Sequence, residues 1–164
     1  MSYKISYSVT PDQAIDDVVN GIRKQVQRRT YLAANELRDS ALIVLRGQRH
    51  GRRYKVPGTY RRQRDKTDGK MKNGRYYTAS APGEPPAVRT GNFRRSWLPN
   101  VSASGDLYNA RIESDLRTDD GKYLLGEILE DGTPHGKMKP RPYVERTLEK
   151  AEPKIARIYS EPYD

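Results

Sequence analysis

The chain has 164 residues, of which 34% are hydrophobic and 32% charged, so it can form one domain with a modest core. It has no cysteine, which excludes disulfides, a thiolate nucleophile and zinc–thiolate sites. The net charge is +10, and no apolar run approaches the ~20 residues that cross a bilayer. The first residues also lack the apolar core of a secretory signal, so we expect a protein made and used in the cytoplasm, or in something assembled there.

The first two expected elements are a short strand and a long helix. Residues 3–9 alternate strictly between apolar and polar side chains, which predicts a half-buried strand. Thr10 and Pro11 then suit the N-cap and first position of a helix that continues to Leu45 and stops at Gly47. This helix would be about 50 Å long at 1.5 Å per residue, more than the domain needs to cover its own core. Its expected inner stripe is Ile15, Val18, Val19, Ile22, Val26, Ala33, Leu37, Ala41 and Val44, with a bend expected between residues 28 and 30.

Residues 46–86 form a long basic segment, here called the basic arm, which is rich in glycine and proline and poor in apolar side chains apart from tyrosines. Twelve Lys or Arg and two Asp lie between residues 46 and 75, so this segment accounts for the whole net charge and the rest of the chain is balanced. Such a concentration predicts contact with a polyanion or an acidic protein surface. The residues expected to make it are Arg49, Arg52, Arg53, Lys55, Arg61, Arg62, Arg64, Lys70, Lys72 and Arg75, and the alternative is a solvated loop.

Within the basic arm, residues 75–78 suggest an extended stretch. The tyrosines at 54, 60, 76 and 77 could pack on a nucleic-acid backbone or on protein. The Pro-rich run 82–86 is best interpreted as a stiff linker that positions the basic arm, and a peptide-recognition motif is the less favoured alternative.

The last third of the chain predicts four more elements. Thr90 suits the N-cap of a short helix over 91–97, and a hairpin follows with strands 98–103 and 107–113 around a turn at 104–106. Apolar residues at helical spacing predict a helix within 122–130 that ends at Gly132. Pro142 would open a C-terminal helix, kinked at Pro153, with an inner face of Val144, Leu148, Ala151, Ile155 and Ile158. The fold class expected is α+β, with the two long helices packed on a small antiparallel sheet in one domain, residues 1–164.

Catalysis finds little support in the sequence. His50 and His135 lie in unrelated loops, and no metal-binding or nucleophile motif is present. The pairs Asp16–Asp17 and Asp119–Asp120 could hold Mg²⁺ for a nuclease but more simply serve a helix start and a turn. We therefore expect a protein that is not an enzyme and needs no cofactor or metal.

Two runs of residues together carry a family resemblance. The first is residues 81–96, APGEPPAVRTGNFRRS, and the second combines Tyr123, LEDGT at 129–133, MKPRPYV at 138–144 and LEKA at 148–151. In this order, after a basic segment and a long helix, they resemble the tail-completion or neck proteins of long-tailed bacteriophages, over about residues 14–155. Asp131 departs from the pattern, since an aromatic residue is usual there.

The resemblance implies a structural virion protein that joins the tail to the DNA-filled head as a ring around the DNA channel. A hexamer is favoured, with portal, adaptor, stopper, tail-terminator or tail-tube proteins and channel DNA as partners. The subunit interface is expected to include Phe93, Trp97, Arg141 and Tyr143. Two alternatives remain open: a dodecameric adaptor on the portal side, and a free nucleic-acid-binding protein that uses residues 46–75.

Overall fold

One helix runs along most of the molecule, and the other elements pack against it. In the computed structural model, which describes residues 10–56 and 76–163, α1 (Pro11–Arg46) has 36 residues. A capping box starts it: Gln13 N donates to Thr10 Oγ1 at 3.3 Å, and Thr10 N donates to Gln13 Oε1 at 3.2 Å. The predicted N-cap, the first position and the stop at Gly47 are confirmed. The strand predicted over residues 3–9 lies outside the described residues.

The helix α1 is continuous through residues 28–30, where a bend was expected. Its apolar stripe is interrupted there because polar residues occupy the buried face. Arg29 and Thr30 are buried there, and both find hydrogen-bond partners. Arg29 donates to the carbonyl oxygens of Glu161 and Pro162, while the Tyr159 hydroxyl lies 3.1 Å from Thr30 Oγ1. Two polar residues thus occupy the buried face and tie the end of the chain to the middle of α1.

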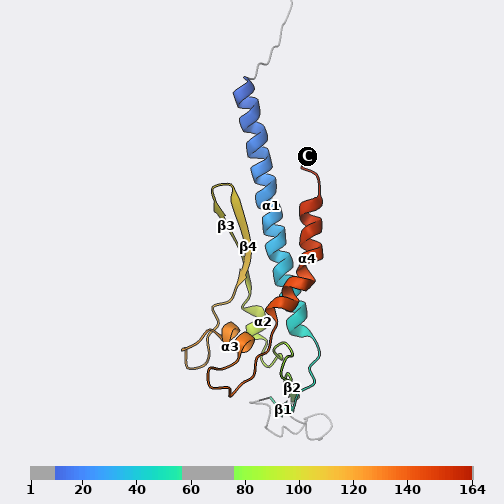
Figure 1. Ribbon diagram of the computed structural model, residues 1–164, viewed down its shortest axis with the longest axis vertical. Helices are drawn as coiled ribbons and strands as arrows, with labels where there is room; N and C mark the ends of the chain where they lie inside the picture. The colour runs from blue at the N-terminus through green and yellow to red at the C-terminus, as the bar shows by residue number, and fades with distance from the viewer. Residues whose placement is uncertain (1–9, 57–75, 164) are drawn as a thin grey trace, which may run out of the picture.

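Two further elements flank α1 (Figure 1). On one side lies the hairpin of β3 (Leu98–Ser104) and β4 (Leu107–Glu113), joined by a two-residue turn in which Gly105 has φ +60°. On the other side lies α4 (Val144–Ser160), antiparallel to α1. Small residues form the centre of this packing, since Ala33, Ala34, Ala41 and Ala151 are at most 1% exposed. The predicted α+β class, the two long helices and the hairpin are confirmed.

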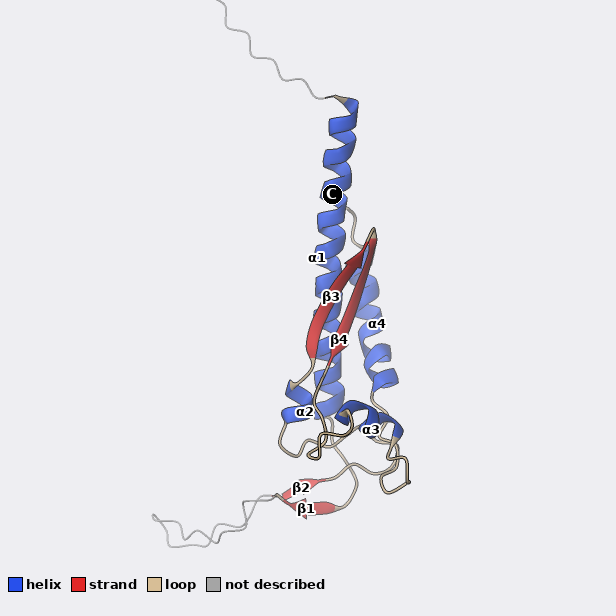
Figure 2. Cartoon of the chain, turned by 90° about the vertical axis from the view of Figure 1, so that its left-hand side faces the viewer, coloured by secondary structure: helices blue, strands red, loops and turns tan. Residues whose placement is uncertain are grey.

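Three shorter elements complete the described part. The short helix α2 (Asn92–Arg95) begins after Gly91, which has φ +82°, and is shorter than the predicted 91–97. Thr90 Oγ1 accepts from Asn92 N, so Thr90 supports the turn without being the N-cap residue. The helix α3 (Leu125–Asp131) ends at Gly132 as predicted. A separate two-stranded ribbon, β1 (Arg53–Lys55) with β2 (Tyr76–Thr78), lies at the end of the molecule away from the N-terminus of α1 (Figure 2).

The inner faces predicted for the two long helices are partly wrong. Val144 and Leu148 are exposed, and α4 instead buries Thr147 and Ala151, with Ile155 and Ile158 half-buried. The buried strip of α4 is rotated away from Leu148 because small residues allow close approach to α1. At the other end of α1, Ile15, Val18, Val19 and Ile22 are exposed, since neither the hairpin nor α4 extends over them.

The alanine packing gives a direct test. Replacing the fully buried Ala151 with Leu forces extra methylenes between α1 and α4, so we expect the free energy of unfolding to fall by about 1–3 kcal/mol. Ala156→Leu, on the exposed side of the same helix, should change it by less than about 0.5 kcal/mol. Urea denaturation followed by circular dichroism measures both. Equal effects of the two variants would contradict the packing.

Candidate functional site

The β1–β2 ribbon is an exposed surface of alternating aromatic and basic side chains. Antiparallel pairing places Tyr54 opposite Tyr77, with ring centroids 5.8 Å apart. The guanidinium of Arg52 lies 5.6 Å from the Tyr54 ring, and that of Arg53 lies 4.5 Å from the Tyr76 ring. The Nζ atom of Lys55 lies 5.9 Å from the centroid of the same Tyr76 ring. Cation–π contacts of this kind hold the Arg52 and Arg53 guanidiniums against the tyrosine rings on the exposed ribbon.

Three of the ten predicted contact residues therefore lie together at the ribbon: Arg53 and Lys55 in β1, and Arg52 directly before it. Six others lie outside the described residues: Arg61, Arg62, Arg64, Lys70, Lys72 and Arg75. In the sequence they belong to residues 57–75, which connect β1 to β2 and carry seven Lys or Arg against two Asp. The extended conformation predicted for residues 76–78 is confirmed, whereas β1 was not anticipated.

Arg49, the remaining predicted contact, has a structural role. Its guanidinium donates to Val44 O at 2.9 Å and to Pro86 O at 3.1 Å, so it caps the C-terminal end of α1 and holds the 79–90 segment against it. Burial lowers the pKa of Arg49, against the opposite influence of Glu84. A guanidinium with these two carbonyl partners is not a free phosphate ligand.

His50 and Glu84 clasp the base of the ribbon. His50 Nδ1 and Glu84 Oε1 are 2.7 Å apart, and the other carboxylate oxygen accepts from His50 N at 3.1 Å and Ala81 N at 2.7 Å. The backbone donors of Ala81 and His50, followed by the His50 side chain, lower the pKa of Glu84 from 4.5 to about 2. Beside them Gly51 N donates to Ala79 O, and a Cβ on Gly51 would lie 2.6 Å from that oxygen, so the close approach requires glycine.

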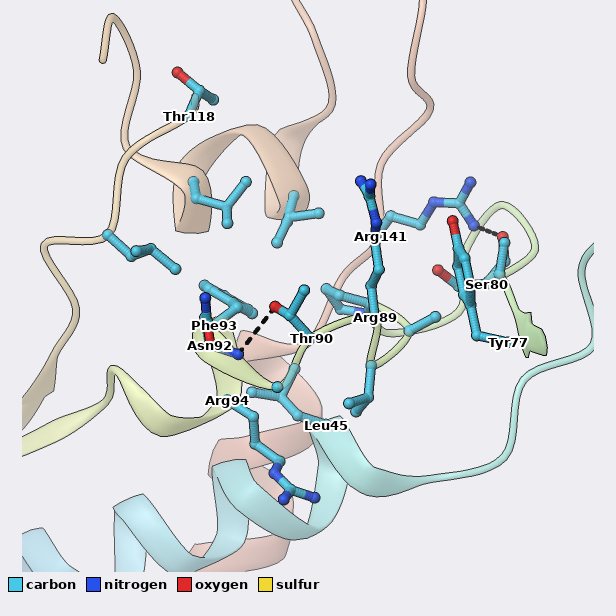
Figure 3. Close-up of a pocket in the computed structure, with 18 of the residues that line it drawn as sticks. Leu45, Tyr77, Ser80, Arg89, Thr90, Asn92, Phe93, Arg94, Thr118 and Arg141 are labelled. Atoms are coloured by element: carbon cyan, nitrogen blue, oxygen red, sulfur yellow. Dashed lines mark hydrogen bonds between the residues drawn. The ribbon is translucent and has the colours of Figure 1, made fainter. Parts of the chain in front are cut away.

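The linker interpretation of residues 82–86 is wrong. Pro85 and Pro86 are buried, Glu84 holds the clasp, and Gly83 N donates to Pro140 O at 3.2 Å. Arg146 donates to Gly83 O at 3.0 Å, and Arg141 donates to Ser80 O (Figure 3). The two sequence runs that carry the family resemblance are therefore bonded to each other and form one base beneath α1.

The aromatic residues predicted for a subunit interface form an internal cluster. Phe93, Trp97 and Tyr143 meet edge to face with centroids 5.6 to 5.8 Å apart, and Tyr143 is only 4% exposed. Tyr143 OH donates to Gly126 O at 3.2 Å, and burial with nearby acidic side chains raises the pKa of Tyr143. Trp97 Nε1 is buried with no hydrogen-bond partner in the described part of the chain. The Tyr143 side chain is thus unavailable to a neighbour, and Arg141 is engaged by Ser80.

An open cavity of about 680 Å³ lies between the 79–94 segment and α3 (Figure 3). Its apolar lining includes Leu45, Pro86, Phe93, Leu129 and Met138, and Arg89 and Arg141 also line it. Within residues 10–56 and 76–163 no group of three or more His, Cys, Asp or Glu side chains could hold a metal ion. Across the same ranges, no helix is long and apolar enough to cross a membrane.

Comparisons with known proteins leave the family open. No family model matches the chain, and neither the curated proteins nor the solved structures contain a significant match.

Several contacts at this site had no signal in the sequence. The cap made by Arg49 and the His50–Glu84 clasp join residues more than 30 positions apart, and nothing in the local sequence indicates either pairing. The interleaved tyrosines were the one signal for the ribbon, and the structure places three of them on it.

The clasp predicts a specific pH dependence. Because the pKa of Glu84 is lowered on folding, its stabilising contribution is complete above about pH 4.5 and is lost as the pH falls towards 2. Glu84→Gln should therefore melt below the wild-type protein at neutral pH, and the two melting temperatures should converge on acidification. Differential scanning fluorimetry over this range measures the difference. A gap that stays constant with pH would show that Glu84 acts by packing alone.

Proposed function

We propose that this chain is a structural subunit of the neck of a tailed bacteriophage, where it forms a ring around the DNA channel and joins the tail to the DNA-filled head. The resemblance of residues 81–96 and 123–151 to tail-completion proteins suggested this function. Support comes from the way these two runs meet: Gly83 N donates to Pro140 O and Arg146 donates to Gly83 O, as expected if the runs form one structural unit rather than chance turn sequences.

The observation that carries the proposal is the amount of apolar surface that the single chain leaves uncovered. Its core centres on alanines, while large apolar side chains remain exposed on α1, on the hairpin and on α4. The exposed residues are Ile15, Val18, Ile22, Tyr31, Leu32, Ile43, Leu98, Leu107, Val144 and Leu148. Exposed apolar surface on several faces of one elongated chain is typical of a subunit that contacts neighbours on more than one side, as ring subunits do.

The ribbon supplies the second half of the proposed mechanism. It lies at one end of the molecule, apart from the apolar faces, so a ring held by those faces could direct its basic ribbons towards a common partner (Figure 2). That partner is DNA in the channel or the acidic face of an adjacent ring. The mechanism is mechanical and electrostatic and involves no catalytic step.

Native mass spectrometry with negative-stain electron microscopy tests the assembly. We expect closed rings, six copies being favoured, either alone or beside a portal or tail-tube ring of the same phage. Twelve copies seated on the portal would favour the adaptor alternative. A protein that remains monomeric alone and with both partner rings would contradict the proposal.

The exposed stacks of Arg and Tyr also favour a second candidate, a free nucleic-acid-binding protein, because aromatic and cationic side chains together suit a nucleic-acid backbone and its bases. An isolated monomer that binds DNA tightly would support this candidate. Weak binding by the monomer and strong attachment in the ring would support the neck.

Salt dependence tests the ribbon directly. If Arg52, Arg53 and Lys55 contact phosphates, replacing all three with Gln should reduce the slope of log K against log salt by up to about three, since each contact contributes roughly 0.9. Fluorescence anisotropy with duplex DNA measures the slope. A control with the same charge change, Lys24, Lys122 and Lys150 to Gln, uses exposed residues outside the ribbon. Equal losses in both variants would mean that only net charge matters.

A further inference from the structure

The first three turns of α1 carry an apolar stripe that no element within residues 10–56 and 76–163 covers. Ile15, Val18, Val19 and Ile22 continue, at helical spacing, the same stripe that α4 and the hairpin cover further along. Val18 is 62% exposed and Ile15 60%. The hairpin reaches α1 only as far as Arg23, through Asp106 at its turn, and the chain end reaches it at Arg29. Figure 1 shows the helix projecting beyond both.

The charges beside this stripe are arranged in a self-complementary way. Asp12 and Asp16 lie on one flank of the stripe near the start of the helix, and Arg23 lies on the same flank two turns later. In an antiparallel pair of identical helices, like flanks meet and the acidic start of each helix faces the basic part of the other. In a parallel pair, by contrast, this flank of one helix faces the opposite flank of the other, so Arg23 of one copy meets neither Asp12 nor Asp16 of the other.

We propose that the N-terminal turns of α1, residues 11–26, pair antiparallel with the same segment of a second copy of this chain. The register places Ile15 opposite Ile22 of the second copy and Val18 opposite Val19. Arg23 of each copy then falls between Asp12 and Asp16 of the other. Arg23 already bonds Asp106 at 3.0 Å, but the two side chains are 51% and 81% exposed, so Arg23 remains accessible to the second copy.

The neighbouring elements leave room for this partner. The helix α4 runs antiparallel to α1 and ends near Arg29. The second copy's helix would run in the same direction as α4 and pack on the part of α1 that lies beyond the end of α4. The pair is isologous, so each copy covers the other's stripe. With few large apolar side chains on each side, the contact is smaller than that of a permanent dimer and should be reversible and concentration-dependent. This inference does not depend on the neck function, because it requires no ring and no DNA.

A pair of charge-reversal variants provides the main test. Asp12→Lys with Asp16→Lys in one protein places cations against Arg23, and Arg23→Glu in another places carboxylates against Asp12 and Asp16. Each variant alone should associate about tenfold more weakly than the wild type in sedimentation equilibrium at low salt. An equimolar mixture should recover the wild-type association, because every facing pair is again of opposite sign. Circular dichroism checks that each variant is folded.

Cysteine cross-linking fixes the direction of the helices, since the natural chain has no cysteine. Oxidation of a mixture of Ile15→Cys and Ile22→Cys proteins should give a disulfide-linked dimer, whereas each protein alone should remain mostly uncross-linked. Asn20→Cys, on the opposite side of the helix, is the control and should not cross-link.

Three results would overturn the proposal. One is a wild-type protein that stays monomeric at all concentrations. Another is a mixture of charge variants that associates no better than its components. The third is efficient cross-linking of Ile15→Cys with itself, which would indicate a parallel arrangement. A protein that pairs as described but never forms rings would refute the neck function and leave this inference standing.

Discussion

The packing of α1 against α4 is the contact on which the rest of the structure depends. Ala33, Ala34 and Ala41 on α1 and Ala151 on α4 are at most 1% exposed, and their small side chains permit close approach of the two helices. An alanine contact buries little apolar area per residue, so it stabilises the fold less than a leucine-rich core of the same length would. The chain compensates with polar ties to α1: the chain end bonds Arg29, and Arg49 bonds Pro86. Large apolar side chains remain on the outside, where a neighbour can cover them.

This arrangement separates the molecule into regions with different roles. The projecting start of α1 has an uncovered apolar stripe, the middle is the folded body, and the opposite end holds the basic ribbon. The base between body and ribbon is rigidified by the His50–Glu84 clasp and by the bonds of Arg141 and Arg146 to the 80–83 segment. A rigid base matters for the proposed function, since a ribbon on a loose tether could not be aimed by the assembly of the body.

The sequence predicted the elements well where one periodic pattern decided them. The 3.6-residue period and the Thr10–Pro11 start defined α1, and strict alternation with a glycine turn defined the hairpin. Predictions failed where a partner distant in sequence decided the outcome. The stripe of α1 passes through Arg29 and Thr30 because Glu161, Pro162 and Tyr159 satisfy their hydrogen bonds. In α4 the small Ala151 is buried while Leu148 is exposed. Of the candidate site, charge and tyrosine content indicated the basic segment but not the pairing of β1 with β2. Nothing local distinguished Arg49, which caps a helix, from Arg52, whose guanidinium lies over the Tyr54 ring.

The central claim is that the single chain is incomplete and gains stability from contacts with other copies. Urea unfolding at a series of protein concentrations tests this claim most directly, because association of folded chains stabilises them by mass action. Over about a hundredfold range of protein concentration the account predicts a midpoint that rises steadily with concentration. A cooperative transition with the same midpoint throughout would contradict it, since the chain would then be a complete fold whose exposed apolar faces have no role in its stability.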